Sequence, residues 1–499
     1  MGYLLLEQRY NERTELNNQP IPVIHDTQEY QTHKTFLIPV TEFTNLASYN
    51  SYSDILISDE LYSLSDNKNF LSDELKTSLS FKPTVTFETK TEIYLLTPEQ
   101  VNAKYRTIAI DGKHFWDKSF DEANYPFFYV EKTTTPAITS LPRTILIATG
   151  EIIPARAVDR IGLNKHDNYT YLFDWFSDEL QSADITIGLL ENSVMGNPTP
   201  CTGCMLFVGD DRVIKGLADT GFNFISTAGN HAGDAGQTAY ENTINLLNLN
   251  NIQHTGTGNC SLSSCEGDNK SDLLKPAVKL VNNRTFGMIA ADDVAGYYWD
   301  KDKNSTTFGT NYFSKLDKGL SPDLERLAQI SEIKKKFNID YLIIYMSWGV
   351  EYTNKATTYQ QNLGKLLIEN GADIVIGSHP HWVQNIEFYM DKPIIYSLGN
   401  FIFDQTHTLE TRQGAVVNLF MYGDELKFID IMPHQICGYH QTKNDQTAKY
   451  LNNEINLDQI ALMREEEGCI FWQPKKLNSK QPEYTQIMQR IFEHTNITY

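Results

Sequence analysis

The sequence lacks any long hydrophobic run, and it has few basic residues. A membrane-spanning helix needs roughly 18 consecutive apolar residues, and runs such as ITIGLL fall far short of that length. The opening MGYLLLEQRY is too short for the apolar region of a signal peptide, so neither a signal nor an anchor is visible in the chain. Lysine and arginine number 42 against 63 acidic residues, a formal net charge of −21. Without a basic stripe that could bind phosphates, nucleic acid is not expected as a main partner.

Cysteine is scarce, and the few cysteines are clustered. Cys201 and Cys204 form C-T-G-C, and Cys260 and Cys265 lie in a stretch rich in Ser, Gly and Asn. Two close pairs could form a four-cysteine zinc site or disulfides. The spacing of the second pair is long for a zinc knuckle, which favours disulfides. Disulfides would in turn indicate an oxidising, extracytoplasmic compartment.

The pattern of apolar and polar stretches changes near residue 140, and this change predicts two domains. Residues 1–132 alternate short strand-like runs with polar, helix-like stretches and are interpreted as a smaller α/β domain. Within it, TPEQ from Thr97 predicts a helix start, with an N-cap followed by Pro at the first helical position. Residues 133–143 are rich in Thr and Pro and are expected to form a linker. Residues 144–499 then form the larger domain.

In the larger domain, apolar runs typical of buried strands alternate with amphipathic stretches typical of helices. TILIAT and YLIIYMSWG are examples of the first kind, and QQNLGKLLIENG is an example of the second. Continuous apolar runs predict strands that are buried on both faces, as in a sheet flanked by helices. The fold class is therefore α/β. In such sheets, ligands bind beyond the carboxyl ends of the strands.

Polar side chains that can bind a metal follow several of these strands. In chain order they are Glu151, Glu191, Asn230, His231, Glu351, His379 and His381. Each alone could be a surface carboxylate, a cap or a turn residue, but their recurrence at strand ends is hard to explain in that way. In GSHPHW, an extended backbone would point the two histidines the same way.

Carboxylate, amide and imidazole groups together suit one or two divalent metal ions. Such ions can activate a water molecule and clamp a phosphoryl group. His231, next to Asn230, would then be placed to act as a general acid on a leaving oxygen. The sequence thus predicts a metal site at the strand ends, with a phosphoryl-containing compound as one class of substrate.

These motifs resemble those of the CapA (PgsA) family of capsule and poly-γ-glutamate synthesis proteins, within the calcineurin-like metallophosphoesterase superfamily. The resemblance covers roughly residues 143–420 and is carried in order by ATGEIIPAR, ADITIGLLEN, GFNFISTAGNHAGDAG, SWGVEY, GADIVIGSHPHWVQNIEFY and IIYSLGNFIFDQ. It implies a four-layer α/β/β/α sandwich with its metal site at the strand ends. It also implies a role in making, tethering or exporting an anionic polymer at the cell envelope. Residues 104–129 more faintly resemble part of a substrate-binding-protein-like domain.

The resemblance implies roles for individual residues. It implies one or two divalent ions, Mn, Zn or Fe, as the cofactor. The implied metal ligands are Glu151, Glu191, Asn230, His379 and His381. The implied catalytic residues are His231, Arg156 and Asp234, and the residues taken to contact substrate are Glu351, Trp348 and Asn400.

Three matched positions depart from the family pattern. Ser347 of SWGVEY stands where a metal-binding His is expected, Glu151 stands in place of an Asp, and Leu189 in place of an Asn. Serine is a poor ligand for transition metals, and Glu places its carboxylate farther out than Asp by roughly 1.5 Å, one C–C bond. Either change puts two-metal hydrolysis in doubt.

Three interpretations of function remain open from the sequence. The first is a metal-dependent, phosphoesterase-like hydrolase of capsule or poly-γ-glutamate synthesis in the cell envelope. The second is a non-catalytic envelope component that binds an anionic polymer or membrane synthase subunits through a degenerate site. The third is an α/β hydrolase that is unrelated to envelopes.

Overall fold

The computed structural model describes the larger domain almost throughout and the N-terminal region in part. The described residues are 31–43, 61–63, 81–82, 93–109, 113–118, 128–133, 142–159, 169–196, 198, 205–258, 273–296, 308–315, 320–405, 407–437, 472–495 and 497. Cys201, Cys204, Cys260 and Cys265 lie outside them, and the structure describes no disulfide or zinc site at these pairs. Cys437, which is described, is buried and is not a free thiol.

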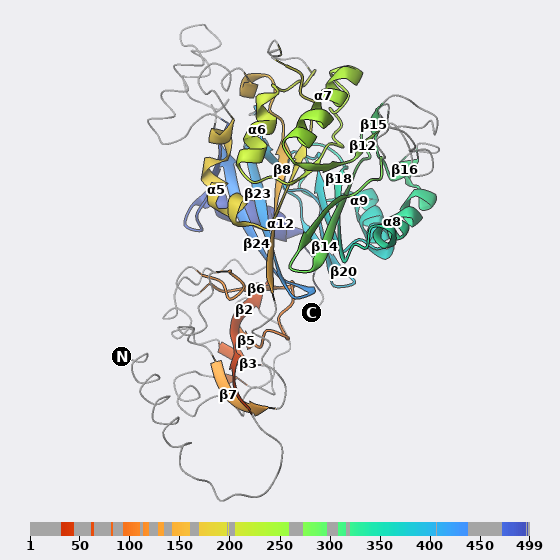
Figure 1. Cartoon of the computed structure of the whole chain (residues 1–499). Coiled ribbons are helices and arrows are strands. Elements are labelled where there is room, and N and C mark those ends of the chain that lie inside the picture. Colours follow the sequence, from red (N-terminus) through yellow and green to blue (C-terminus); the bar gives the residue numbers. More distant parts are fainter. Residues whose placement is uncertain are drawn as a thin grey trace, which may run out of the picture.

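An eight-stranded sheet forms one half of the larger domain (Figure 1). Its order is β11-β10-β9-β8-β23-β24-β25, and β22 also pairs with β8. The strands are β8 (Arg143–Ile152), β9 (Ile185–Leu190), β10 (Phe224–Ser226), β11 (Gln253–Thr255), β22 (Asn400–Ile402), β23 (Gln413–Tyr422), β24 (Glu425–Ile436) and β25 (Pro474–Lys476). The strands β8 to β11 and β22 run parallel, whereas β23, β24 and β25 pair antiparallel.

A six-stranded sheet forms the other half, in the order β13-β14-β18-β19-β21-β20. The strands are β13 (Ala277–Val281), β14 (Arg284–Asp292), β18 (Tyr341–Ser347), β19 (Ile374–Ser378), β20 (Ile386–Tyr389) and β21 (Lys392–Ile395). The central pairs β14–β18, β18–β19 and β19–β21 are parallel. Short pairs join β12 (Thr257–Gly258) to β15 (Gly309–Thr310) and β16 (Ser314–Lys315) to β17 (Ser321–Pro322).

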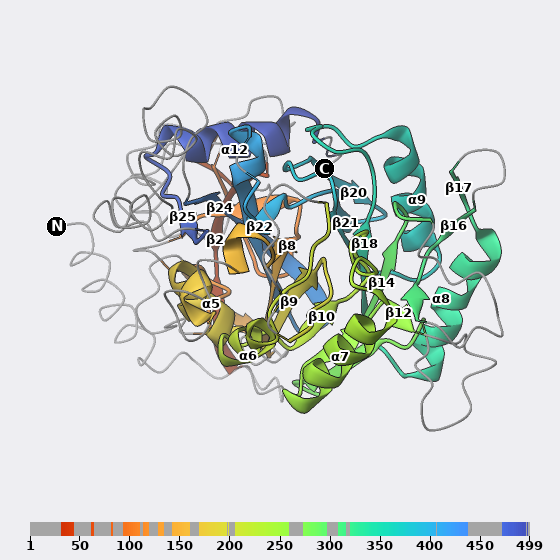
Figure 2. The ribbon, with the colours of Figure 1, turned by 90° about the horizontal axis from the view of Figure 1, so that it is seen from above.

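Hydrophobic cores lie between the two sheets and behind each of them. Ala148, Ile187, Met288 and Tyr345, from strands of both sheets, share one core. A second core packs the eight-stranded sheet against η3 (Thr170–Phe176), α5 (Ser177–Ser182), α6 (Arg212–Asp219) and α7 (Gly236–Leu249). A third packs the six-stranded sheet against α8 (Leu324–Lys336) and α9 (Thr358–Glu369), on the side away from the first sheet (Figure 2). The predicted α/β class is confirmed.

Local sequence explains where the helices begin and end. Thr357 and Gln360 form a reciprocal capping box at the start of α9. The α8 helix ends in Lys334, Lys335 and Lys336, where the positive charges interact favourably with the negative end of the helix dipole. The α12 helix (Pro482–Glu493) starts at a proline, and η4 (Glu410–Arg412) is a single short turn. Within the described residues, no helix is both long and apolar enough to span a membrane.

The described part of the N-terminal region consists of strands. A five-stranded sheet has the order β4-β3-β5-β2-β6, and β1 pairs with β7. These strands are β1 (Gln31–Phe36), β2 (Ile38–Glu42), β3 (Leu61–Ser63), β4 (Phe81–Lys82), β5 (Ile93–Leu96), β6 (Tyr105–Thr107) and β7 (Phe128–Thr133). The boundaries at 1–132, 133–143 and 144–499 stay predictions.

The helix predicted at Thr97 is wrong, because that stretch forms a turn after β5. The side chain of Gln100 accepts from the Thr97 backbone N–H at 2.9 Å, so half of a capping box forms without a helix to follow. The chain is instead drawn into β6, whose residues Tyr105 and Thr107 are buried. Burial of the strand has overridden the local signal.

Candidate functional site

Alternation along the strands brings the predicted site residues to the space between the two sheets. In β9, Ile185, Ile187 and Leu189 face the inter-sheet core, so Glu191, two residues further, continues on that face. In β8, register shifts between Ala148 and Glu151, which marks a bulge. Glu151 and Glu191 are both fully buried, and two buried carboxylates without a cation beside them are costly.

Glu151 is the hub of the cluster. Its Oε1 accepts from the backbone N–H of His379 at 2.5 Å, and its Oε2 lies 2.6 Å from Nδ1 of His381. Burial alone would raise the pKa of Glu151, but the charge of His381 holds that pKa below its usual value. Burial likewise would lower the pKa of His381, and Glu151 more than offsets it. Each side chain therefore favours the charged form of the other.

The two histidines lie together, but not in the extended conformation that the sequence predicts. The β19 strand ends at Ser378, and His379 and His381 have left-handed φ angles of 90° and 59°. Their ring centroids are 6.1 Å apart. Positive φ is rare outside glycine, and such backbone strain clusters at functional sites. A tight turn rather than strand alternation therefore aims both imidazoles at the site.

Asn230 and Glu191 connect the first sheet to this turn. The backbone N–H of Asn230 donates to Glu191 Oε1 at 3.1 Å, and Asn230 Oδ1 lies 3.2 Å from Nδ1 of His379. Burial, together with the charges of Glu151 and Asp292, raises the pKa of Glu191 well above its usual value. Burial also lowers the pKa of His379 to about 3. His379 is thus a neutral imidazole, the form that binds metals.

His231 and Asp234 form a separate pair at the edge of the cluster. Nδ1 of His231 lies 2.8 Å from Oδ2 of Asp234, which also accepts from the backbone N–H of Phe207 at 2.9 Å. The Phe207 ring packs against the imidazole, with centroids 4.1 Å apart. The side chain of His231 is 13% exposed. Asp234 orients the ring and fixes which nitrogen is bonded to it, so that Nε2 remains available for a ligand.

Arg156 does not reach into the cluster directly. Its guanidinium pairs with Asp404 and lies over the rings of Phe207 and Phe403, at 4.6 and 5.0 Å from their centroids. Asp404 also accepts from the Ala157 N–H at 3.0 Å. The pair therefore fixes the loop after β8 beside His231. Its predicted catalytic role stays a prediction.

The residues predicted to contact substrate are placed differently from one another. Glu351 is 38% exposed at the mouth of the site, with Oε1 3.8 Å from Nε2 of His381. Asn400 is buried; its Oδ1 lies 2.8 Å from Nδ1 of His381 and its Nδ2 donates to the Thr411 carbonyl, so it positions that histidine. Trp348 is fully buried in the third core, and its Nε1–H donates to the Tyr396 carbonyl at 2.9 Å. Because no part of its ring is exposed, Trp348 is a core residue and not a substrate contact.

Two residues of the site were missed by the sequence analysis. Asp292 ends β14 and is fully buried, and its charge acts on Glu191. Tyr352 stacks on His381 with centroids 5.9 Å apart, and Gln405 donates to its hydroxyl at 2.8 Å. The doubled aspartate in FGMIAADD, at a strand end like the other candidates, was the available signal for the first. No signal marked Tyr352 apart from its place after Glu351.

Comparison with known proteins identifies the family of this chain. The family model described as "Bacterial capsule synthesis protein PGA_cap" matches residues 145–405, which is more than half of the chain and contains every site residue named above. The chain belongs to this family.

Curated relatives agree with the family match. The "Capsule biosynthesis protein CapA" of Bacillus anthracis is 28% identical over 295 residues, covering 58% of this chain and 66% of that protein. The "PGA biosynthesis protein CapA" of Bacillus subtilis is 27% identical over 353 residues, covering 69% of this chain and 86% of that one. Among solved structures, a putative 5'-nucleotidase from Staphylococcus aureus aligns with a TM-score of 0.37 at 13% identity, over 63% of this chain and 58% of that chain. That structural likeness is too weak to bear on function.

The donor set of this PGA_cap protein fits a divalent cation, although its side chains are not arranged as a closed cage. Among the described residues, no three His, Cys, Asp or Glu side chains converge as a ready-made metal site. The reason is visible at the histidines, whose Nδ1 atoms lie against Glu151, Asn400 and Asn230. Yet Oε2 of Glu191 is buried and accepts no hydrogen bond. A buried carboxylate oxygen of that kind calls for a cation or a proton.

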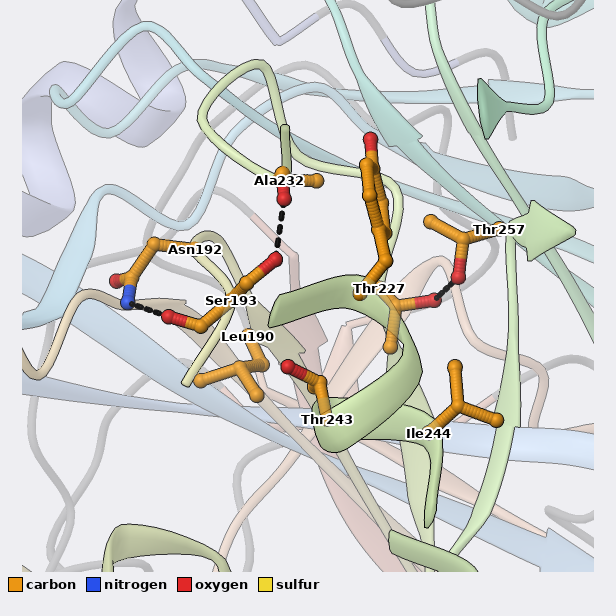
Figure 3. Close-up of a pocket in the computed structure, with 9 residues that line it drawn as sticks. Leu190, Asn192, Ser193, Thr227, Ala232, Thr243, Ile244 and Thr257 are labelled. Carbon is orange, nitrogen blue, oxygen red and sulfur yellow. Dashed lines mark hydrogen bonds between the residues drawn. The ribbon is translucent and has the colours of Figure 1, made fainter. Parts of the chain in front are cut away.

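A small cavity with a mainly apolar wall lies beside Ala232, the residue that follows His231 (Figure 3). Its volume is about 10 Å³, and its lining includes Ser193, Thr227 and Thr257. Ser193 points at the Ala232 carbonyl, and the two threonine hydroxyls lie 2.7 Å apart. Such a volume accommodates about one water molecule. The cavity therefore belongs to the support of the loop and has no room for a substrate.

Proposed function

We propose that this PGA_cap protein is a metal-dependent, phosphoesterase-like hydrolase that acts in capsule or poly-γ-glutamate synthesis at the cell envelope. One observation carries the proposal: Glu151, Glu191, Asn230, His379 and His381 come together, buried, at the ends of strands from both sheets. Oxygen and imidazole donors in this mixture suit Mn, Zn or Fe.

The residues divide into a binding group and a proton-handling group. Glu151, Glu191, Asn230, His379 and His381 would hold the metal. When bound, such an ion makes a hydroxide available near neutral pH and stabilises charge on a phosphoryl group. Nε2 of His231 is placed to protonate the oxygen of a leaving group, because Asp234 holds Nδ1 on the other side of the ring. Glu351, at the mouth, would contact the part of the substrate that extends out of the site.

The proposed setting follows from the names of the relatives. Two curated relatives are described as proteins of capsule or PGA biosynthesis. We infer from them that an anionic polymer or its phosphoryl-containing precursor is the substrate class, with membrane synthase subunits as partners outside the cytoplasm. The net charge of −21 argues that a polyanion would approach this chain only where a bound cation offsets the carboxylates.

A second function is favoured by one specific observation. Ser347, the last residue of β18, occupies the position where the family pattern has a histidine, and it is fully buried. A site that lacks this imidazole could bind polymer or synthase subunits without turnover. The two functions differ in whether a phosphoester is hydrolysed.

Metal content and hydrolysis measured on the same preparations separate the two functions. We would compare wild type, His379→Ala/His381→Ala, and the control His254→Ala, whose ring lies outside the site against Asn248. Each is incubated with Mn²⁺, Zn²⁺ or Fe²⁺, freed of unbound metal and assayed by mass spectrometry, then with bis-p-nitrophenyl and p-nitrophenyl phosphate. Metal and hydrolysis present in wild type and control but lost in the double variant is the expected result. Metal without hydrolysis of either ester, together with binding of poly-γ-glutamate, would establish the second function instead.

A further inference from the structure

Asp292 and Ser347 end neighbouring strands of the six-stranded sheet. They are directly paired in the parallel register of β14 and β18, at the last position of each strand. Paired residues of parallel strands direct their side chains to the same face of the sheet. A carboxylate therefore lies beside the serine at the position where the family pattern has an imidazole.

Alternation places both side chains on the face that looks toward the other sheet. In β14, Met288 and Ala290 belong to the inter-sheet core, whereas Ile289 and Ala291 pack on the helices. Asp292 continues the first series. In β18, Ile343 and Tyr345 belong to the same inter-sheet core, and Ser347 continues that series.

Glu191 lies across the gap, at the end of β9 in the eight-stranded sheet. Asp292 and Glu151 are both close enough to Glu191 for their charges to raise its pKa. Oε2 of Glu191 is fully buried and has no hydrogen-bond partner. Three buried carboxyl groups thus share one histidine, His381, which is paired with Glu151, and an oxygen of Glu191 has no partner. The negative charge that this leaves uncompensated would be offset by a cation.

Asp292 is held rigidly in this position. Its Oδ1 accepts from the Val294 N–H at 3.0 Å, and its Oδ2 accepts from the Ala295 N–H at 3.1 Å. Each carboxylate oxygen has a second lone pair left. Its neighbour Asp293 is engaged elsewhere, with Ser314 Oγ at 2.5 Å and the Tyr359 hydroxyl at 2.6 Å. Only the first aspartate of the doubled pair is therefore directed at the site.

We propose that Asp292, next to Ser347, takes the place of the missing imidazole and contributes an oxygen ligand to the metal centre. The exchange of nitrogen for oxygen makes the centre favour hard, oxygen-preferring Mn²⁺ relative to Zn²⁺, in comparison with a centre that has a histidine at residue 347. The proposal rests on the proposed function, since it assigns a further ligand to the same centre.

Metal affinity of the full-length chain, without any assay of activity, tests the proposal. Apo protein is titrated calorimetrically with Mn²⁺ and, separately, with Zn²⁺. We expect Asp292→Asn, which keeps one carbonyl acceptor for the turn, to weaken Mn²⁺ binding by at least about tenfold. The matched control is Asp159→Asn, which alters a carboxyl group that is equally buried but hydrogen-bonds Tyr169 instead; its affinities should equal those of wild type.

Restoring the imidazole provides an independent arm. Ser347→His should raise Zn²⁺ affinity relative to Mn²⁺ affinity by at least about tenfold, because imidazole suits Zn²⁺ better than a hydroxyl or carboxylate does. Circular dichroism and thermal unfolding check that each variant folds. If either Asp292→Asn or Ser347→His does not fold, the result of the other variant decides.

The outcomes separate this proposal from the proposed function. Wild-type Mn²⁺ affinity in Asp292→Asn, or an unchanged Zn²⁺ to Mn²⁺ preference in Ser347→His, overturns the role of Asp292 and leaves the metal centre standing. A wild-type chain that binds neither ion overturns both the role of Asp292 and the metal-dependent hydrolase.

Discussion

Nδ1 of His381 lies 2.6 Å from Oε2 of Glu151, so the turn after one sheet is paired with a bulged strand of the other. The contact joins the two halves of the larger domain at the point where Asn230 also reaches His379. A ligand bound between these groups touches both sheets. The stability of the whole domain is therefore expected to respond to metal.

Mn²⁺ should stabilise the wild-type chain against thermal unfolding. At a free concentration 100 times its Kd, a ligand that binds only the folded state stabilises it by about 2.7 kcal/mol. Differential scanning calorimetry with increasing Mn²⁺ should show a rising Tm in wild type and in His254→Ala. In His379→Ala/His381→Ala the Tm should not move. An equal rise in the double variant would mean that the ion binds somewhere else.

Asp234→Asn should slow hydrolysis without changing metal content. The substitution replaces the carboxylate that holds Nδ1 of His231 and orients its ring, and general acid catalysis contributes about 10²–10⁴-fold. The loss of kcat should be large for an alkyl phosphoester, whose leaving oxygen needs a proton, and small for a p-nitrophenyl ester, whose leaving group does not. Equal losses for both esters would show that Asp234 supports only the fold.

Trp348→Phe should destabilise the chain while its metal affinity stays as in wild type. The indole N–H that is lost satisfies the Tyr396 carbonyl, and leaving a buried acceptor unpaired costs about 1–3 kcal/mol. Urea unfolding gives the free energy of unfolding, and calorimetric titration gives the affinity. A raised KM for substrate at unchanged stability would instead show that Trp348 contacts the substrate.

Asp159 should make the chain less stable as pH rises through the neutral range. Burial raises the pKa of Asp159 from 3.8 to about 8, so between these values the folded state holds a proton that the unfolded state has lost. Folding then binds protons, and the free energy of unfolding falls by up to about 1.4 kcal/mol per pH unit. Asp159→Asn lacks this slope, so its stability relative to wild type should increase from pH 5 to pH 8 in urea unfolding. A constant difference would contradict the raised pKa.

The α/β class and most residues of the site were predictable from the sequence. The backbone conformation that directs their side chains was not. Strand ends carrying Glu151, Glu191, Asn230 and the paired histidines follow from apolar runs that stop at polar residues, and the structure brings them together. The backbone at the histidines could not be foreseen, because alternation applies only within β19 and both residues lie beyond its end. A turn with left-handed residues leaves no periodic signal.

Trp348 and Asp292 show the opposite errors. The tryptophan followed a strand end and was taken for a ligand contact, but its large apolar surface is buried in a core that only the packing of α9 on the sheet creates. Asp292 sits at an equally informative strand end and was passed over, since nothing in sequence alone tells that β14 and β18 are neighbours. Strand order is a property of the tertiary fold.

The pairing of β8 with β23 has a consequence for biosynthesis. On one side β8 pairs with β9, which follows it soon in the chain. On the other side it pairs with β23 along residues 143–148 and with β22 at Glu151 and Ile152. Both β22 and β23 are synthesised after the strands of the six-stranded sheet. Until then, one side of β8, including Glu151, has no partner strand. Contacts so distant along the chain form late and slowly. The larger domain thus cannot mature stepwise, and a premature stop before β23 would release a chain with an open, aggregation-prone edge at its centre.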